Sequence, residues 1–219
     1  MTDTQLVVFD CDGVLVDSEV IVAEHEAIRL TEAGFPLTFD DIAERFIGLS
    51  YTSMMTALHE QFGRPVPTAL SESIQAEVLA LFPERLQPVA GIAELIENLG
   101  LPRCVASSSN LDRIRLSLDV TGLSSFFDRD HVFSAQMVRR GKPAPDLFLH
   151  AAEHLDTGPA HCLVIEDSPH GVTAARAAGM EVVGFVGGGH ARPPLRRRLE
   201  AAGAETIVDS AAHLAELIS

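Results

Sequence analysis

The chain has 219 residues, of which 47% are hydrophobic, so it can bury the core of one large domain or of two unequal ones. Its 31 acidic residues against 16 basic ones give a formal net charge of −15, which repels nucleic acids and anionic membranes and argues against both as partners. Its three cysteines have no zinc-ligand spacing and are typical of small buried residues in a reducing compartment.

The N-terminus has no basic region followed by an apolar one, as a secretory leader would have. No uninterrupted apolar run reaches the roughly 18 residues that a membrane span needs. We therefore expect a cytoplasmic protein that does not enter a membrane.

The first predicted element is a buried strand over residues 6–10, "LVVFD". It ends in two carboxylates, Asp10 and Asp12, with Gly13 directly after them. The offset of two residues places both side chains on the same side of an extended segment, and glycine lets the chain turn away sharply. A strand end that gathers two carboxylates needs an explanation in chemistry or in a cation.

The next ninety residues or so carry no convincing strand and read as helices. Thr38, with Asp41 three residues later, is expected to cap the second helix, and Ser50 to cap the third. A crossover between parallel strands needs only one helix, so this run predicts an inserted helical subdomain. The expected helices cover residues 19–33, 39–47, 51–62 and 68–82.

Strands and helices alternate through the rest of the chain, which predicts an α/β fold with a doubly wound, mainly parallel sheet. One such helix carries Ile92, Leu95, Ile96 and Leu99 at the spacing of a single helix face. We expect a core domain of residues 1–17 and 86–219, and a helical cap subdomain of residues 18–85. The expected strands cover residues 103–108, 162–167 and 181–186, with weaker candidates at 131–135 and 205–209.

Carboxylates, hydroxyls and one lysine stand at or just after strand or loop ends, which is where open α/β sheets keep their active sites. Carboxylates so close together are hard to keep ionised without a cation, and oxygen-rich sites of this kind suit Mg²⁺. The candidates are the pair Asp10 and Asp12, the stretch Ser107–Asn110, Lys142, and the pair Glu166 and Asp167.

The stretches "DCDGVLVDS", "VASSSN", "GKPAPDLF" and "VIEDSPHGV" resemble, in this order, the four motifs of the haloacid dehalogenase (HAD) superfamily. The helical insertion after the first motif resembles the C1-type cap of its phosphoglucomutase-like members. The resemblance extends from residue 6 to about residue 186. It implies a Rossmann-like core with an inserted cap and a phosphoric monoester hydrolase activity.

By this resemblance, Asp10 is the nucleophile that forms an aspartyl-phosphate, and Asp12 is the general acid that later deprotonates the attacking water. The Mg²⁺ ligands it implies are Asp10, the main-chain carbonyl of Asp12, and Asp167, with Glu166 binding directly or through water. The dehalogenase branch lacks an acid at the second aspartate position, so Asp12 favours phosphoryl transfer.

The resemblance also assigns the phosphate contacts. Ser107 and the main-chain amide of Ser108 would hold the phosphoryl oxygens at the N-terminus of the following helix. Lys142 would neutralise phosphate and carboxylate charge together.

We therefore expect a Mg²⁺-dependent phosphatase of a small phosphorylated metabolite, such as a sugar, sugar-acid or sugar-alcohol phosphate, acting as a monomer or weak homo-oligomer. One alternative is a hexose phosphomutase similar to β-phosphoglucomutase. Against it, Tyr51 stands where that family has a cap arginine, and Val22 about where it has a histidine. A non-catalytic metabolite-binding module is a further alternative, which the four intact motifs argue against.

Overall fold

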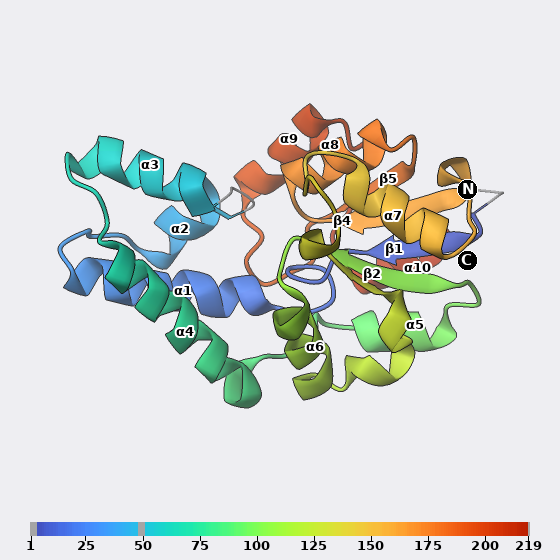
Figure 1. The fold of residues 1–219 in the computed structure, drawn as a ribbon, viewed down its shortest axis with the longest axis horizontal. Coiled ribbons are helices and arrows are strands. Elements are labelled where there is room, and N and C mark those ends of the chain that lie inside the picture. Colours follow the sequence, from blue (N-terminus) through green and yellow to red (C-terminus); the bar gives the residue numbers. More distant parts are fainter. Residues whose placement is uncertain (1–3, 48–50, 219) are drawn as a thin grey trace.

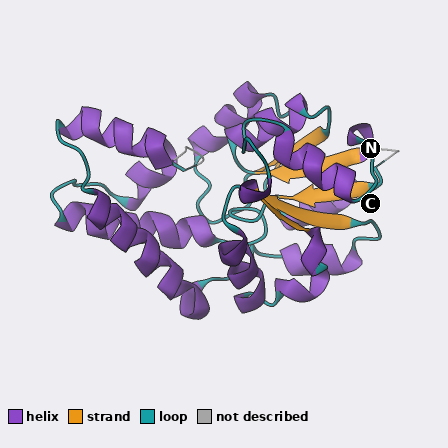
Figure 2. Cartoon of the chain, viewed as in Figure 1, coloured by secondary structure: helices purple, strands orange, loops and turns teal. Residues whose placement is uncertain are grey.

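The strands form one parallel sheet in the computed structural model, which describes residues 4–47 and 51–218. The strand order is β3-β2-β1-β4-β5-β6, the doubly wound order in which β2 and β3 are added on one side of β1 and β4, β5 and β6 on the other. The fold class predicted from the sequence is thereby confirmed (Figure 2). The strands are β1 (Leu6–Phe9), β2 (Arg103–Ser107), β3 (Val132–Ser134), β4 (Cys162–Glu166), β5 (Glu181–Phe185) and β6 (Thr206–Val208).

Strand β1 lies at the centre of the sheet, and all four of its side chains are fully buried. Val8 is in register with Cys104 of β2 on one side and with Val164 of β4 on the other. A strand covered on both faces has no solvent side, which explains why its sequence shows an unbroken apolar run instead of alternation.

Helices cover both faces of this sheet (Figure 1). On one face α7, α8 and α9 bury an apolar cluster with Leu6 and Val8 of β1, and on the other α5, α6 and α10 do so with Val7 and Phe9. The alternating residues of each strand thus face two separate helical layers. The helices are α5 (Ile92–Asn98), α6 (Leu111–Val120), α7 (Asp146–His154), α8 (Pro169–Ala177), α9 (Pro193–Ala202) and α10 (Ala211–Ile218).

A second group of helices stands beyond one end of the strands, at the left of Figure 1. The Thr38 hydroxyl accepts from the amide of Asp41, whose carboxylate accepts from the amide of Thr38, so the expected capping box is confirmed. Ser50, the expected cap of the third helix, lies outside the described residues. These helices are α1 (Ser18–Glu32), α2 (Phe39–Arg45), α3 (Tyr51–Phe62) and α4 (Thr68–Arg85).

Helix α4 runs three residues further than the sequence predicted, because Pro83 does not end it. Proline lacks an N–H and leaves the carbonyl four residues earlier unbonded; here that residue is Leu79, which is 37% exposed and can bond to water. Helix α4 is 18 residues long, yet none of the helices in the described ranges is both long and apolar enough to cross a membrane.

Two short chain segments connect the group α1–α4 to the sheet, and they lie side by side. The amide of Asp17 donates to the carbonyl of Gln87 over 3.0 Å, and the amide of Val89 donates to the carbonyl of Leu15 over the same distance. The predicted division at residues 17/18 and 85/86 falls on these segments and stays a prediction.

Candidate active site

The candidate site residues follow the carboxyl ends of β1 and β4, which are neighbours in the sheet. The amide of Asp10 donates to the carbonyl of Ile165 over 3.0 Å, which places Asp10 beside Glu166. This is the point where the strand order reverses, and there the connections diverge to leave a crevice. A cavity of about 700 Å³ lies there, between the sheet and the helices α1 and α4, and Asp10, Asp12 and Asp167 line it.

Three buried carboxylates gather at this cavity, and two of them, Asp10 and Asp167, line it. Asp10, Glu166 and Asp167 each offer an oxygen atom, and these atoms lie within 4.8 Å of one another. Lys142, 2% exposed, donates to Asp10 Oδ1 over 3.0 Å, to Glu166 Oε1 over 2.6 Å and to the carbonyl of Ala106 over 2.9 Å. The lysine thus pairs with two of the three carboxylates, and a hard divalent cation would balance the negative charge that remains.

The electrostatics of the cluster follow from its burial. Burial raises the pKa of Asp10 well above its ordinary value; Lys142 opposes this rise and Glu166 adds to it. Burial likewise raises the pKa of Asp167, with Glu166 as the next cause. For Lys142, burial alone would lower the pKa, but the carboxylates of Asp10 and Glu166 outweigh it and raise the pKa. The lysine is thus held charged, while the carboxyls need a further positive partner.

Two glycines let the chain approach these carboxylates closely. A Cβ atom at Gly13, which has a φ of +79°, would clash with Asp167 Oδ2. A Cβ atom at Gly171 would clash with a carboxylate oxygen of Glu166. Any side chain at either position would displace a site carboxylate, which accounts for both glycines.

Asp12 is held by three donors. Its carboxylate accepts from Ser18 Oγ over 2.5 Å, from Ser109 Oγ over 2.6 Å and from Arg113 Nη2 over 2.9 Å. Burial raises the pKa of Asp12, but Arg113 and the hydrogen bonds outweigh burial, and the net pKa is lowered. This arrangement favours the ionised form of Asp12 and directs its carboxylate toward Arg113 of α6.

The serine stretch leads from β2 into α6. Ser107 is buried and its hydroxyl accepts from the amide of Ser109 over 3.1 Å, while Ser108 is exposed toward the cavity that both residues line. Asn110 caps α6 by accepting from the amide of Arg113 over 2.8 Å. The structure thus brings Ser107 and Ser108 to the same cavity as Asp10, next to a capped helix N-terminus.

All seven residues to which the sequence assigned a role converge on one site. Ser109 lies in the candidate stretch Ser107–Asn110 but had no role assigned, and sequence reasoning missed four other residues. Ser109 and Arg113 hold Asp12, and Glu19 and Glu26 line the cavity from α1. His190 is buried with Nε2 3.1 Å from Asp167 Oδ2. For Arg113 the available signal was its place one turn into the helix after the serine stretch. The other residues carried no comparable signal.

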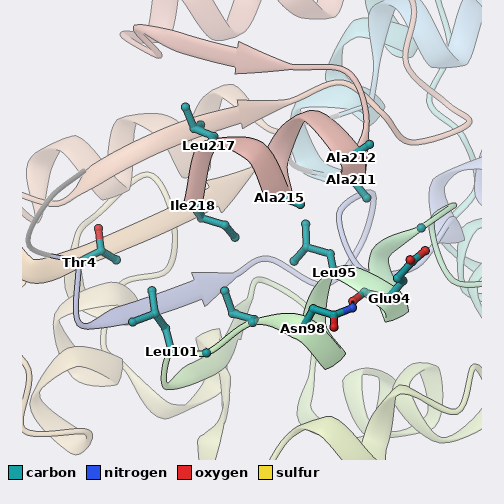
Figure 3. A pocket seen from close by; sticks show the side chains of 13 residues that line it. Thr4, Glu94, Leu95, Asn98, Leu101, Ala211, Ala212, Ala215, Leu217 and Ile218 are labelled. Atoms are coloured by element: carbon teal, nitrogen blue, oxygen red, sulfur yellow. The ribbon is translucent and has the colours of Figure 1, made fainter.

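A larger cavity of about 850 Å³ lies between α5 and α10 (Figure 3). Leu95, Leu101 and Ile218 are among its lining residues, and Glu94 is the one ionisable side chain among those described. A largely apolar wall offers no nucleophile or cation ligand, so the chemistry belongs to the smaller cavity.

Comparison with known proteins agrees with this geometry. The family model described as haloacid dehalogenase-like hydrolase matches residues 7–185. A 6-phosphogluconate phosphatase of Escherichia coli is 30% identical over 194 residues, which are 88% of this chain and 87% of that protein.

Two solved structures are similar over nearly the whole chain. A haloacid dehalogenase-like protein of Agrobacterium tumefaciens has a TM-score of 0.93 at 36% identity, covering 98% of this chain and 97% of its own. A HAD family hydrolase of Deinococcus radiodurans, solved with bound phosphate and sodium, has a TM-score of 0.84 at 33% identity, covering 98% and 94%.

Proposed function

The chain belongs to the haloacid dehalogenase-like hydrolases, and from this premise we propose that it is a Mg²⁺-dependent phosphatase of small phosphorylated metabolites. The observation that carries the proposal is the position of Asp10. Its carboxylate lies at the floor of a cavity, 3.0 Å from Lys142 and within the cluster formed with Glu166 and Asp167. The names of similar proteins, such as 6-phosphogluconate phosphatase, support this class of substrate.

In the first step Asp10 attacks the phosphorus atom through a carboxylate oxygen. The bond from phosphorus to the leaving oxygen breaks, and Asp12 supplies the proton that this oxygen needs. Asp12 must then be protonated, so its contact with Arg113 has to weaken when the substrate binds, because that contact lowers its pKa.

In the second step Asp12 takes a proton from water, and the resulting hydroxide attacks the phosphorus of the aspartyl-phosphate. Inorganic phosphate leaves and the Asp10 carboxylate is restored, so atoms and charge balance. Lys142, Ser107 and the main-chain amide of Ser108 hold the phosphoryl oxygens throughout.

The residues present fit a divalent cation, because Asp10, Glu166 and Asp167 are hard oxygen ligands with only one lysine among them. Asp10, Asp167 and the main-chain carbonyl of Asp12 would hold Mg²⁺, and the ion would supply the positive charge that lets phosphate approach the carboxylates. Both Glu166 oxygens already accept hydrogen bonds, from Lys142 and from Ser168, which favours contact through water.

The test is phosphate release from a panel of sugar, sugar-alcohol and sugar-acid phosphates in Mg²⁺ buffer. We expect turnover of at least one compound by the native enzyme, none by Asp10→Asn, and native turnover by Asp130→Asn, an exposed aspartate outside the cavity. Equal rates for the native enzyme and Asp10→Asn would contradict the proposal.

A further inference from the structure

One face of α1 lines the part of the cavity that extends away from Asp10. Glu19, Val22 and Glu26 stand three and seven residues apart, a spacing that places them on the same side of a helix, and all three line the cavity. Seven residues of helix span about 10 Å, so this face runs along a leaving group of roughly hexose size.

The two glutamates on this face have no partner. Within the described residues, neither Glu19 nor Glu26 accepts a hydrogen bond or forms an ion pair. Elsewhere on the same helix, Glu24 pairs with Arg85 over 2.6 Å and Glu32 pairs with Arg29 over 2.9 Å. Among the described residues, the two glutamates of α1 that line the cavity are thus unpaired, whereas Glu24 and Glu32 of the same helix form ion pairs.

Burial dominates the pKa of both glutamates, although the charge of Arg113 opposes the shift in each. Burial raises the pKa of Glu19 to about 7, with Asp12 as the next cause. Burial raises the pKa of Glu26 to about 8, with Glu19 as the next cause. Above these pKa values both glutamates are ionised without an ion-pair partner among the described residues, so a further anion is unfavourable along this face, whereas a hydrogen-bond donor or a cation is favoured.

The cations of the cavity are already engaged. Arg113 pairs with Asp12 over 2.9 Å, and Lys142 pairs with Asp10 over 3.0 Å and with Glu166 over 2.6 Å. The described lining residues include no other lysine or arginine. A second anionic group on the substrate, distant from the phosphate, would therefore meet the glutamates without a cation to balance it.

We propose that Glu19 and Glu26 select the substrate: they accept hydrogen bonds from hydroxyl or ammonium groups of the leaving group and exclude phosphate esters that carry a second anion. This rests on the proposed phosphatase function and narrows it. Of the substrates expected from the sequence, sugar and sugar-alcohol phosphates remain, amino-sugar phosphates join them, and sugar-acid phosphates are excluded. The specificity then differs from that named for the Escherichia coli relative.

The experiment measures binding in the Asp10→Asn background, where turnover cannot consume the ligand. Glucose 6-phosphate, glucosamine 6-phosphate and 6-phosphogluconate share one phosphate and a six-carbon frame but differ in the charge of the rest. Calorimetric titration in Mg²⁺ buffer at pH 8.5, above the pKa of both glutamates, gives a Kd for each. We expect 6-phosphogluconate to bind about tenfold more weakly than glucose 6-phosphate, and glucosamine 6-phosphate to bind at least as tightly.

Two substitutions, each combined with Asp10→Asn, test whether this difference in Kd comes from the glutamates of α1. Glu26→Gln keeps the shape and an acceptor oxygen but removes the acid. With this change 6-phosphogluconate should bind only about threefold more weakly than glucose 6-phosphate. Glu26→Arg should make 6-phosphogluconate the tightest ligand of the three. Glu60→Gln, the same change at an exposed position of α3 outside the cavity, should leave the gap unchanged.

Equal or tighter binding of 6-phosphogluconate, absence of binding by all three compounds, or a gap that Glu26→Gln leaves unchanged would overturn the proposal. The phosphatase function fails by a different result: the compounds bind in the expected order, but the native enzyme releases no phosphate from them. That outcome would support the selection of ligands by charge and would contradict the proposed phosphatase activity.

Discussion

The guanidinium of Arg113 donates a hydrogen bond to the carboxylate of Asp12 over 2.9 Å, although 101 residues separate the two in sequence. The same guanidinium lies 5.2 Å from the ring centre of Phe82 on α4. Arg113 therefore touches both the loop after β1 and the helix group α1–α4. A change in the position of that group can reach Asp12 through this side chain.

The ion pair between Arg113 and Asp12 should make the effects of their substitutions on the free energy of unfolding non-additive. Arg113→Met leaves a largely buried carboxylate without its cation, so we expect a loss of about 1–3 kcal/mol in the free energy of unfolding. Asp12→Asn with Arg113→Met should lose less than the sum of the single changes, by about 1 kcal/mol. Urea unfolding of the four proteins measures this, and strict additivity would show that the pair contributes nothing. Arg140→Met, which breaks an exposed pair with Asp146, should change stability little.

Asp10→Asn should abolish turnover and leave the fold intact. An amide cannot serve as the nucleophile, while the loss of one charge relieves repulsion from Glu166 and Asp167. Steady-state phosphate release beside thermal melting checks both parts. A variant that melts like the native protein and turns over at the native rate would place the nucleophile elsewhere.

Activity should require Mg²⁺, and EDTA should remove it reversibly. Calcium should inhibit, because its larger and looser coordination disturbs the geometry of in-line attack. Binding should also raise the melting temperature in a concentration-dependent manner, and Asp167→Asn should weaken that rise, because one proposed ligand is lost. Full activity in metal-free buffer, or the same rise in Asp167→Asn, would assign the acids another role.

Glu26 should make stability depend on pH. Its folded pKa of about 8 lies above its ordinary value of 4.5, so the folded state binds the proton more tightly. The stability that this proton contributes is present below pH 4.5 and is lost as the pH rises through about 8. Glu26→Gln removes the loss, so the variant should gain on the order of 1 kcal/mol over the native protein at pH 8.5 relative to pH 4.5.

Denaturant unfolding of both proteins at these two pH values makes the comparison, with Glu60→Gln as the control for an exposed glutamate. A difference between native protein and Glu26→Gln that is independent of pH would show that Glu26 titrates normally.

Phosphate release should exceed isomerisation. A hexose phosphomutase needs a cationic cap group for the distal phosphate, and Val22, about where such enzymes have a histidine, is an uncharged lining residue. The other departure, at Tyr51, lies outside the described side chains. A coupled assay for glucose 6-phosphate, run on β-glucose 1-phosphate with a trace of the bisphosphate, compares the two rates. Isomerisation faster than phosphate release would favour the mutase.

The sequence by itself determined the sheet and the positions of the chemical groups. Strands buried on both faces carry unbroken apolar runs, so β1 and β4 could be predicted from those runs alone. The acids that follow each run were visible in the same way. Asp10, Glu166 and Asp167 could be assigned to one site because carboxyl ends of parallel strands lie at one edge of a sheet. These are local signals, each contained within a few residues.

Only the tertiary structure decided which side chains face one another. Arg113 reaches Asp12, and Glu19 and Glu26 face the cavity without a partner among the described residues, because of how α6 and α1 pack against the strand ends. A helix sequence shows which residues share a face but not what that face meets, and a charged residue on it reads the same whether water or a substrate lies opposite. The reactive groups are therefore visible in the sequence, whereas the groups that hold Asp12 and those proposed to select the substrate depend on distances that no local pattern encodes.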